Sequence, residues 1–144
     1  MARQPEQKQG IDILVISHNR IDMTMRCINT VYSNTKLPFH LIVVDDSTDL
    51  TPLWLRELHK EHDNVTYIHS GTPYKTGNQI FNIGIENCQT SHMATVMNSV
   101  LVEPDWDIAG MQLMNMDAKI GIIGFKCLLP NGLIESAGLK MVKW

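Results

Sequence analysis

Two short apolar runs decide the fold class of this chain: Ile11-Asp-Ile-Leu-Val-Ile16 and Leu41-Ile-Val-Val44. Both runs are rich in β-branched residues and almost continuous, which is typical of strands buried on both faces of a parallel sheet. Between them, residues 21–32 place apolar side chains at helical spacing. A buried strand, an amphipathic helix and a second buried strand together predict a βαβ unit.

The same alternation continues along the chain. The sequence predicts further strands over residues 65–68, 93–97 and 120–123, and further helices over 51–58, 78–88 and 104–117. The tripeptide Pro130-Asn131-Gly132 favours a tight turn between two strands near the end. We therefore predict an α/β fold with a mostly parallel sheet flanked by helices. Residues 1–10 are expected to be a flexible lead-in, and residues 11–144 a single domain.

The composition of the chain argues against several classes of protein. The chain has 144 residues, of which 44% are hydrophobic and 19% charged, as in an ordinary globular protein and unlike a disordered one. Its net charge of −3 argues against binding to nucleic acid. Since there is no apolar run of about 20 residues and no signal-peptide core at the polar N-terminus, we expect no transmembrane segment and a cytoplasmic location. The three cysteines are far apart in the sequence and are expected to be free thiols.

Polar residues follow the predicted strands at their carboxyl ends, where open α/β sheets bind ligands. Ser17-His18-Asn19-Arg20 follows the first strand, Asp45-Asp46 the second, and Met97-Asn98-Ser99 the strand over 93–97. The first of these turns contains no glycine, which argues against a dinucleotide-binding dehydrogenase. We therefore expect a ligand site of another kind at this edge.

Two of these positions have both a binding and a structural interpretation. The carboxylates of Asp45-Asp46 could accept hydrogen bonds from a ribose hydroxyl or a base N–H, or they could cap a loop through backbone amides. His18 could lie along a base or titrate near neutral pH, or it could be an ordinary loop residue. Taken alone, the residues favour the structural interpretation at both positions.

A family resemblance adds to this evidence. The segments 13–20 and 41–49 resemble the opening of a family 2 inverting glycosyltransferase with the GT-A fold. The likeness continues through 77–84 and 102–106, and segment 129–138 is similar to rhamnosyl- and galactofuranosyl-type members of the family. These motifs occur in the family's order and extend over residues 11–142.

The resemblance implies that the chain binds a nucleotide-diphosphate sugar and transfers the sugar to an unknown acceptor with inversion. It places the base near Ser17 and His18, and it gives Asp46 the base N–H or the ribose. Asn82 matches the family's asparagine, although Phe81 replaces the arginine usual before it. The expected nucleotide-binding residues are Ser17, His18, Asn19, Asp45, Asp46, Lys75, Gly77 and Asn82, and no catalytic residue is identified.

Two departures from the family qualify that expectation. Its Asp-x-Asp metal motif, which holds Mn²⁺ or Mg²⁺, falls on Met97, Asn98 and Ser99, so the sequence predicts no conventional metal site. Family members also continue for about a hundred residues or more, a span that carries the acceptor surface and the catalytic base. The alternative is therefore a degenerate, non-catalytic module that binds a nucleotide or a partner. A third hypothesis is a homo-oligomer, formed through apolar surface that the missing half would cover.

Overall fold

A computed structural model describes residues 9–71 and 77–138 of the chain. The chain forms two compact units, residues 1–106 and 107–144, which are described separately. Among the described residues, no helix is both long and apolar enough to cross a membrane. The first unit alternates strands and helices in the order β1 (Ile11–Ser17), α1 (Ile21–Asn34), β2 (Phe39–Asp45), α2 (Thr51–Glu61), β3 (Val65–His69), α3 (Gly77–Ile85) and β4 (Met93–Met97).

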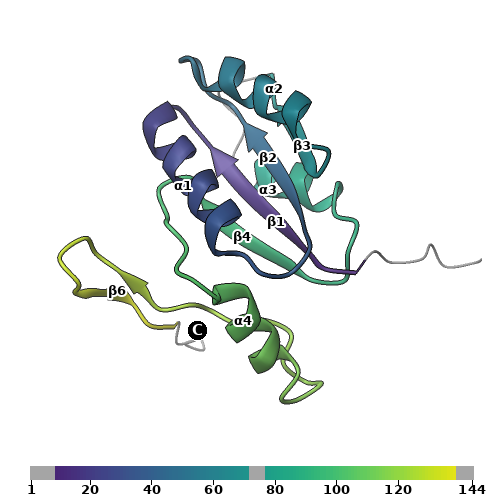
Figure 1. The fold of residues 1–144 in the computed structure, drawn as a ribbon, viewed down its shortest axis with the longest axis vertical. Helices are drawn as coiled ribbons and strands as arrows, with labels where there is room; N and C mark the ends of the chain where they lie inside the picture. The colour runs from purple at the N-terminus through teal and green to yellow at the C-terminus, as the bar shows by residue number, and fades with distance from the viewer. Residues whose placement is uncertain (1–8, 72–76, 139–144) are drawn as a thin grey trace, which may run out of the picture. The chain divides into compact units, whose positions relative to one another are not determined.

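The strands form one parallel sheet in the order β3-β2-β1-β4. Figure 1 shows α1 in front of the sheet and α3 behind it, so β1 and β2 run between two layers of helix. This arrangement confirms the predicted α/β fold with a mostly parallel sheet. The strand order also reverses direction at β1. Strands β2 and β3 lie on one side of β1, and β4 pairs with the other edge of β1.

The core lies at the two central strands. All seven residues of β1 are buried, as are the last five of β2, which explains their continuous apolar sequences. On one face of the sheet, Leu14 and Ile42 pack in a cluster with Ile80 of α3. On α1, the buried positions Cys27, Ile28 and Val31 recur at helical spacing. A rigid, doubly covered sheet therefore supports the loops at its carboxyl edge.

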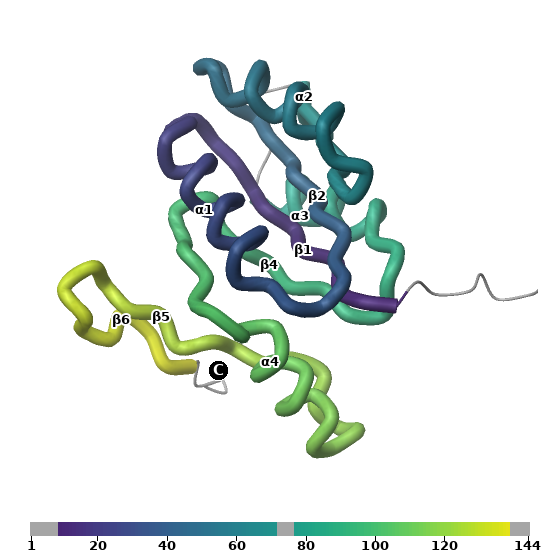
Figure 2. Tube along the Cα trace, in the orientation of Figure 1, coloured from purple at the N-terminus to yellow at the C-terminus, as the bar shows by residue number. Residues whose placement is uncertain are grey.

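The second unit contains a short helix and a hairpin. Helix α4 (Trp106–Met114) begins at the last residue of the first unit and is shorter than the predicted helix over 104–117. Strands β5 (Cys127–Leu128) and β6 (Ile134–Ser136) pair antiparallel and can be followed at the yellow end of the trace in Figure 2. Gly132 has a φ of 81°, as a tight turn with glycine requires, so the predicted hairpin is confirmed.

The strand predicted over residues 120–123 is wrong. The structure assigns no regular element there, and the side chain of Ile122 is 91% exposed. A strand needs a neighbouring strand for its backbone hydrogen bonds and a buried face for its side chains. Among the described residues, this apolar segment has no strand partner, and apolar sequence alone was not enough to form one.

Candidate functional site

The polar strand ends predicted from the sequence lie side by side. Strand β1 runs between β2 and β4, with Ser17 opposite Asp45 and Ile16 opposite Met97. The residues that follow these strands therefore share the carboxyl edge of one sheet. This edge also lies where the strand order reverses, which is the usual position of a ligand crevice in an open α/β sheet.

His18 and Asp46 meet directly at this edge. The Nδ1 atom of His18 lies 2.7 Å from Oδ1 of Asp46, although the two residues are 28 positions apart in the sequence. Asp46 is only 7% exposed, whereas the His18 side chain is 59% exposed. The second Asp46 oxygen, Oδ2, has no hydrogen-bond partner among the described residues. The pair therefore presents a free carboxylate oxygen and an open imidazole ring.

Asn19 sets the proton position on His18. The backbone N–H of Thr48 donates to Oδ1 of Asn19 at 2.8 Å, so the other end of that side chain is the NH₂ group. That group lies 3.4 Å from Nε2 of His18, which must then be the acceptor nitrogen. In the neutral ring the proton is consequently on Nδ1, where it is donated to Asp46.

The loop that carries His18 has an uncommon backbone conformation. Asn19 and Arg20 have φ values of 54° and 61°, in the left-handed region that residues other than glycine seldom adopt. The N–H of Asn19 donates to Oγ of Ser47 at 2.6 Å, and its carbonyl accepts a hydrogen bond from Nδ2 of Asn98 at 3.3 Å. Contacts from the residues that follow β2 and β4 thus hold the loop in this conformation from two sides.

Asp45 and Asp46 have different roles despite being adjacent. Asp45 is fully buried and accepts hydrogen bonds from the Ser47 hydroxyl, Tyr67 and His69. Burial, together with the negative charge of Asp45 and their hydrogen bond, raises the pKa of Tyr67 to about 12. Asp45 therefore fits the loop-holding interpretation, while Asp46 is the carboxylate with a free oxygen.

The Ser17 side chain is held by a contact in the protein interior. Its hydroxyl lies 3.2 Å from that of Thr24 on α1, and both residues are fully buried. Thr24 in turn accepts a hydrogen bond from Nδ2 of Asn98 at 3.0 Å. The sequence had assigned no role at this edge to Thr24, Tyr67 or His69. Thr24 was detectable as a polar residue on the buried stripe of α1, and Tyr67 and His69 as alternate residues of a strand next to Asp45.

The sequence of the chain is similar to that of a known protein family. The sequence profile described as glycosyl transferase family 2 matches residues 12–124, which is most of the chain. The chain belongs to glycosyl transferase family 2. Among curated protein sequences, none is significantly similar to it.

Solved structures similar to the chain include two glycosyltransferase folds. One is a mannosyltransferase from Pyrobaculum calidifontis in complex with GDP-Man and Mn²⁺, with a TM-score of 0.69 and 17% identity. The similarity covers 83% of this chain and 36% of that one. Another is residues 1–349 of TarS of S. aureus in complex with UDP-GlcNAc, with a TM-score of 0.64 and 16% identity, covering 73% of this chain and 31% of that one. The family 2 chain described here thus spans about a third of the length of these structures and shares their fold.

The position of the family's metal motif does not fit a divalent cation. Met97 offers a thioether and Ser99 a hydroxyl where hard cations prefer carboxylates, and the Asn98 amide nitrogen is engaged in hydrogen bonds. Among the described residues, no three His, Cys, Asp or Glu side chains are grouped to hold a metal. The remaining parts of the sequence contain one further residue of these types, Glu6.

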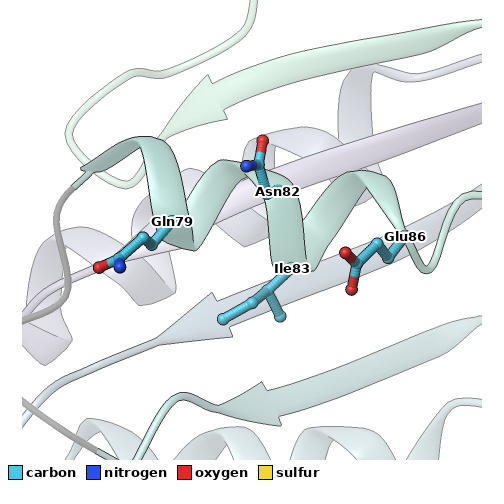
Figure 3. A pocket seen from close by; sticks show the side chains of 4 residues that line it. All are labelled: Gln79, Asn82, Ile83 and Glu86. Carbon is cyan, nitrogen blue, oxygen red and sulfur yellow. The ribbon is translucent and has the colours of Figure 1, made fainter.

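Helix α3 carries the other predicted positions of this family 2 chain. Gly77 begins the helix, and Asn82 lines a shallow pocket of about 260 Å³ with Gln79, Ile83 and Glu86 (Figure 3). No hydrogen bond among the described residues joins Asn82 or Gly77 to His18 or Asp46. Lys75 lies outside the described residues. The structure thus gathers His18, Asn19 and Asp46, with Ser17 and Asp45 beneath them as support.

Proposed function

We propose that this chain is the nucleotide-binding portion of a glycosyltransferase that transfers a sugar from a nucleotide-diphosphate donor to an acceptor with inversion. The observation that carries the proposal is the His18–Asp46 pair at the carboxyl edge of the sheet, with one Asp46 oxygen free. Family membership supports it, as do the donors bound by similar structures, GDP-Man in the mannosyltransferase and UDP-GlcNAc in TarS.

Each residue at the edge has a distinct part in this proposal. The free Oδ2 of Asp46 accepts a hydrogen bond from a base N–H or a ribose hydroxyl. The exposed ring of His18 lies along the base, and Asn19 keeps that ring in one tautomer. Asn82 and Gly77 approach the nucleotide from the side of α3, and the family resemblance gives Lys75 a part in the same contact. During transfer, the acceptor oxygen bonds to the anomeric carbon as the bond to the diphosphate breaks, and a general base takes the hydroxyl proton.

Binding to nucleotides tests the proposal directly. We expect isothermal titration to detect binding of at least one donor from a panel that includes UDP-, GDP- and dTDP-sugars. Rhamnose and galactofuranose donors belong in the panel because segment 129–138 resembles transferases of those types. Asp46→Asn replaces one acceptor oxygen by a donor and should weaken binding by about tenfold or more. Asp63→Asn alters an exposed carboxylate at the opposite, amino end of β3 and should leave affinity unchanged. Absence of heat with every donor would contradict the proposal.

A non-catalytic binding module is the second candidate, and Met97-Asn98-Ser99 at the metal-motif position favours it. Donor hydrolysis separates the two functions, because a transferase usually hydrolyses its donor slowly without an acceptor. Turnover by the unchanged chain would exclude the non-catalytic module. Turnover that appears only in a Met97→Asp/Ser99→Asp variant, and only with Mn²⁺, would favour it.

A further inference from the structure

The residue that follows β4, Asn98, uses its side chain for hydrogen bonds within the protein. The side chain of Asn98 donates two hydrogen bonds through Nδ2, to the carbonyl of Asn19 at 3.3 Å and to Oγ1 of Thr24 at 3.0 Å. Its backbone N–H donates to the carbonyl of Ile16 at 3.2 Å. Asn98 therefore links β4 to the end of β1, the loop after it and α1.

The orientation of the Asn98 amide follows from its partners. A backbone carbonyl accepts hydrogen bonds and cannot donate them, so the atom facing Asn19 must be the NH₂ nitrogen. One of its protons is thereby directed at the loop that carries His18, and the other at Thr24 of α1. The Asn98 side chain could therefore offer a cation only its one amide oxygen, and the neighbouring Met97 and Ser99 side chains supply no carboxylate.

We propose that donor binding by this chain does not depend on a divalent cation, and that Asn98 is instead a positioning residue for the nucleoside. This inference rests on the proposed function. Asn98 holds the left-handed backbone of Asn19, Asn19 holds the ring of His18, and His18 is bonded to Asp46. The contacts to the nucleoside then supply the binding energy. The loop that makes them is already held in its binding conformation, so it loses less entropy when the nucleotide binds.

Calorimetry with UDP and with GDP, in EDTA and in Mn²⁺, tests the cation part. For the nucleotide that binds, we expect dissociation constants in the two conditions to agree within about twofold, since no set of carboxylates links the diphosphate to a metal. Binding that is at least about tenfold tighter in Mn²⁺ would overturn the inference while leaving the proposed function intact. Absence of binding in both conditions would contradict the proposed function and this inference with it.

Substitution of Asn98 tests the positioning part. Asn98→Asp replaces both donated protons by an oxygen that faces the carbonyl of Asn19, and it should weaken binding in EDTA by about tenfold. Asn115→Asp, an exposed position that follows α4, is the control and should not change affinity. Wild-type affinity of the Asn98→Asp variant in EDTA would contradict the positioning role.

A spectroscopic measurement distinguishes positioning from a general effect on folding. The ¹⁵N chemical shifts of the His18 ring report which nitrogen carries the proton. We expect the Nδ1–H form in the wild type and a mixture of both tautomers in Asn98→Ala, with an unchanged circular dichroism spectrum. An unchanged His18 tautomer in a folded Asn98→Ala protein would overturn the proposed link. If either variant fails to fold, the comparison of EDTA with Mn²⁺ on the wild type still decides whether a cation is needed.

Discussion

Asp12 is a charged residue near the amino end of the buried strand β1, and the structure explains how it is tolerated. Its carboxylate is fully buried and accepts hydrogen bonds from Gln89 N at 2.9 Å, Thr90 N at 2.7 Å and Thr90 Oγ1 at 2.8 Å. His40 Nδ1 lies 2.8 Å from the other oxygen. Burial by itself would raise the pKa of Asp12, but the hydrogen bonds from Thr90, His40 and Gln89 outweigh it, so the pKa is lowered.

Asp12→Asn should therefore destabilise the protein. The variant places NH₂ protons against existing donors, and we expect it to lower the free energy of unfolding at pH 7 by roughly 3 kcal/mol. Urea denaturation measures this, with Asp63→Asn as the exposed control. Because the folded pKa is lowered, the contribution of Asp12 is present above its unfolded pKa of about 3.9 and is lost as pH falls through the folded pKa. The difference in free energy of unfolding between the wild type and the variant should become smaller in that pH range. A difference that stays constant would contradict the lowered pKa of Asp12.

Cys27 should be the least reactive thiol of the protein. It is fully buried on α1, and burial raises its pKa to about 12. Since the thiolate is the reactive form, we expect iodoacetamide at pH 8 to modify Cys27 at least about a hundredfold more slowly than the partly exposed Cys127. Mass spectrometry of digested, labelled protein measures both rates in one sample. Equal labelling of the two cysteines in folded protein would contradict the burial of Cys27.

At the scale of the secondary-structure elements, α3 packs closely on the sheet at Gly84. A Cβ atom added there would lie 2.3 Å from Cδ1 of Leu14, a fully buried side chain of β1. Leu14 belongs to the core cluster that also includes Ile80 of the same helix, so it has little room to move. The small residue at position 84 therefore sets the distance between helix and sheet.

Gly84→Ala should lower the free energy of unfolding by about 1–3 kcal/mol, because overpacking of the core exceeds the gain in helix propensity of about 1 kcal/mol. Gly77→Ala is the matched control, since a Cβ at position 77 meets no atom within 4 Å. It should be neutral or slightly stabilising. Chemical denaturation compares the two variants, and a stabilised Gly84→Ala protein would show that α3 does not lie as close to Leu14 as described.

At the scale of the whole molecule, the second unit exposes many apolar side chains. Among its described residues, no hydrophobic side chain is buried. Those of Met116, Ile122, Leu133 and Ile134 are 60–91% exposed. Extensive exposed apolar surface often marks a contact with another polypeptide. We propose that copies of this chain associate through the second unit, which accords with the homo-oligomer expected from the sequence.

Sedimentation velocity over a range of protein concentrations tests this association. We expect the wild type to show a mass that increases with concentration, and Ile122→Asp/Leu133→Asp to shift it towards the monomer. Leu53→Asp, which alters a 58% exposed leucine of α2 in the first unit, should behave as the wild type. A monomer at every concentration would contradict the proposal.

Local sequence pattern was sufficient for the fold class, for the order of strands and helices up to β4, and for the polar ends of the strands. The physical reason is that burial on both faces of a strand, or on one stripe of a helix, leaves its mark in residues close together in the sequence. The hairpin was predictable for a similar reason, since its turn needs a residue with a positive φ, which Gly132 supplies.

The roles of individual residues depended on contacts between distant parts of the chain. The sequence does not distinguish Asp45 from its neighbour Asp46. In the structure, Tyr67 and His69 form hydrogen bonds with Asp45, whereas His18 pairs with Asp46. The position of Asn98, 79 residues from its partner Asn19, likewise follows from the pairing of β4 with β1. Residues 120–123 show the converse, because a strand-like sequence without a neighbouring strand has no partner for its backbone groups. Hydrogen-bond partners of this kind are set by how the chain folds back on itself, which local pattern does not encode.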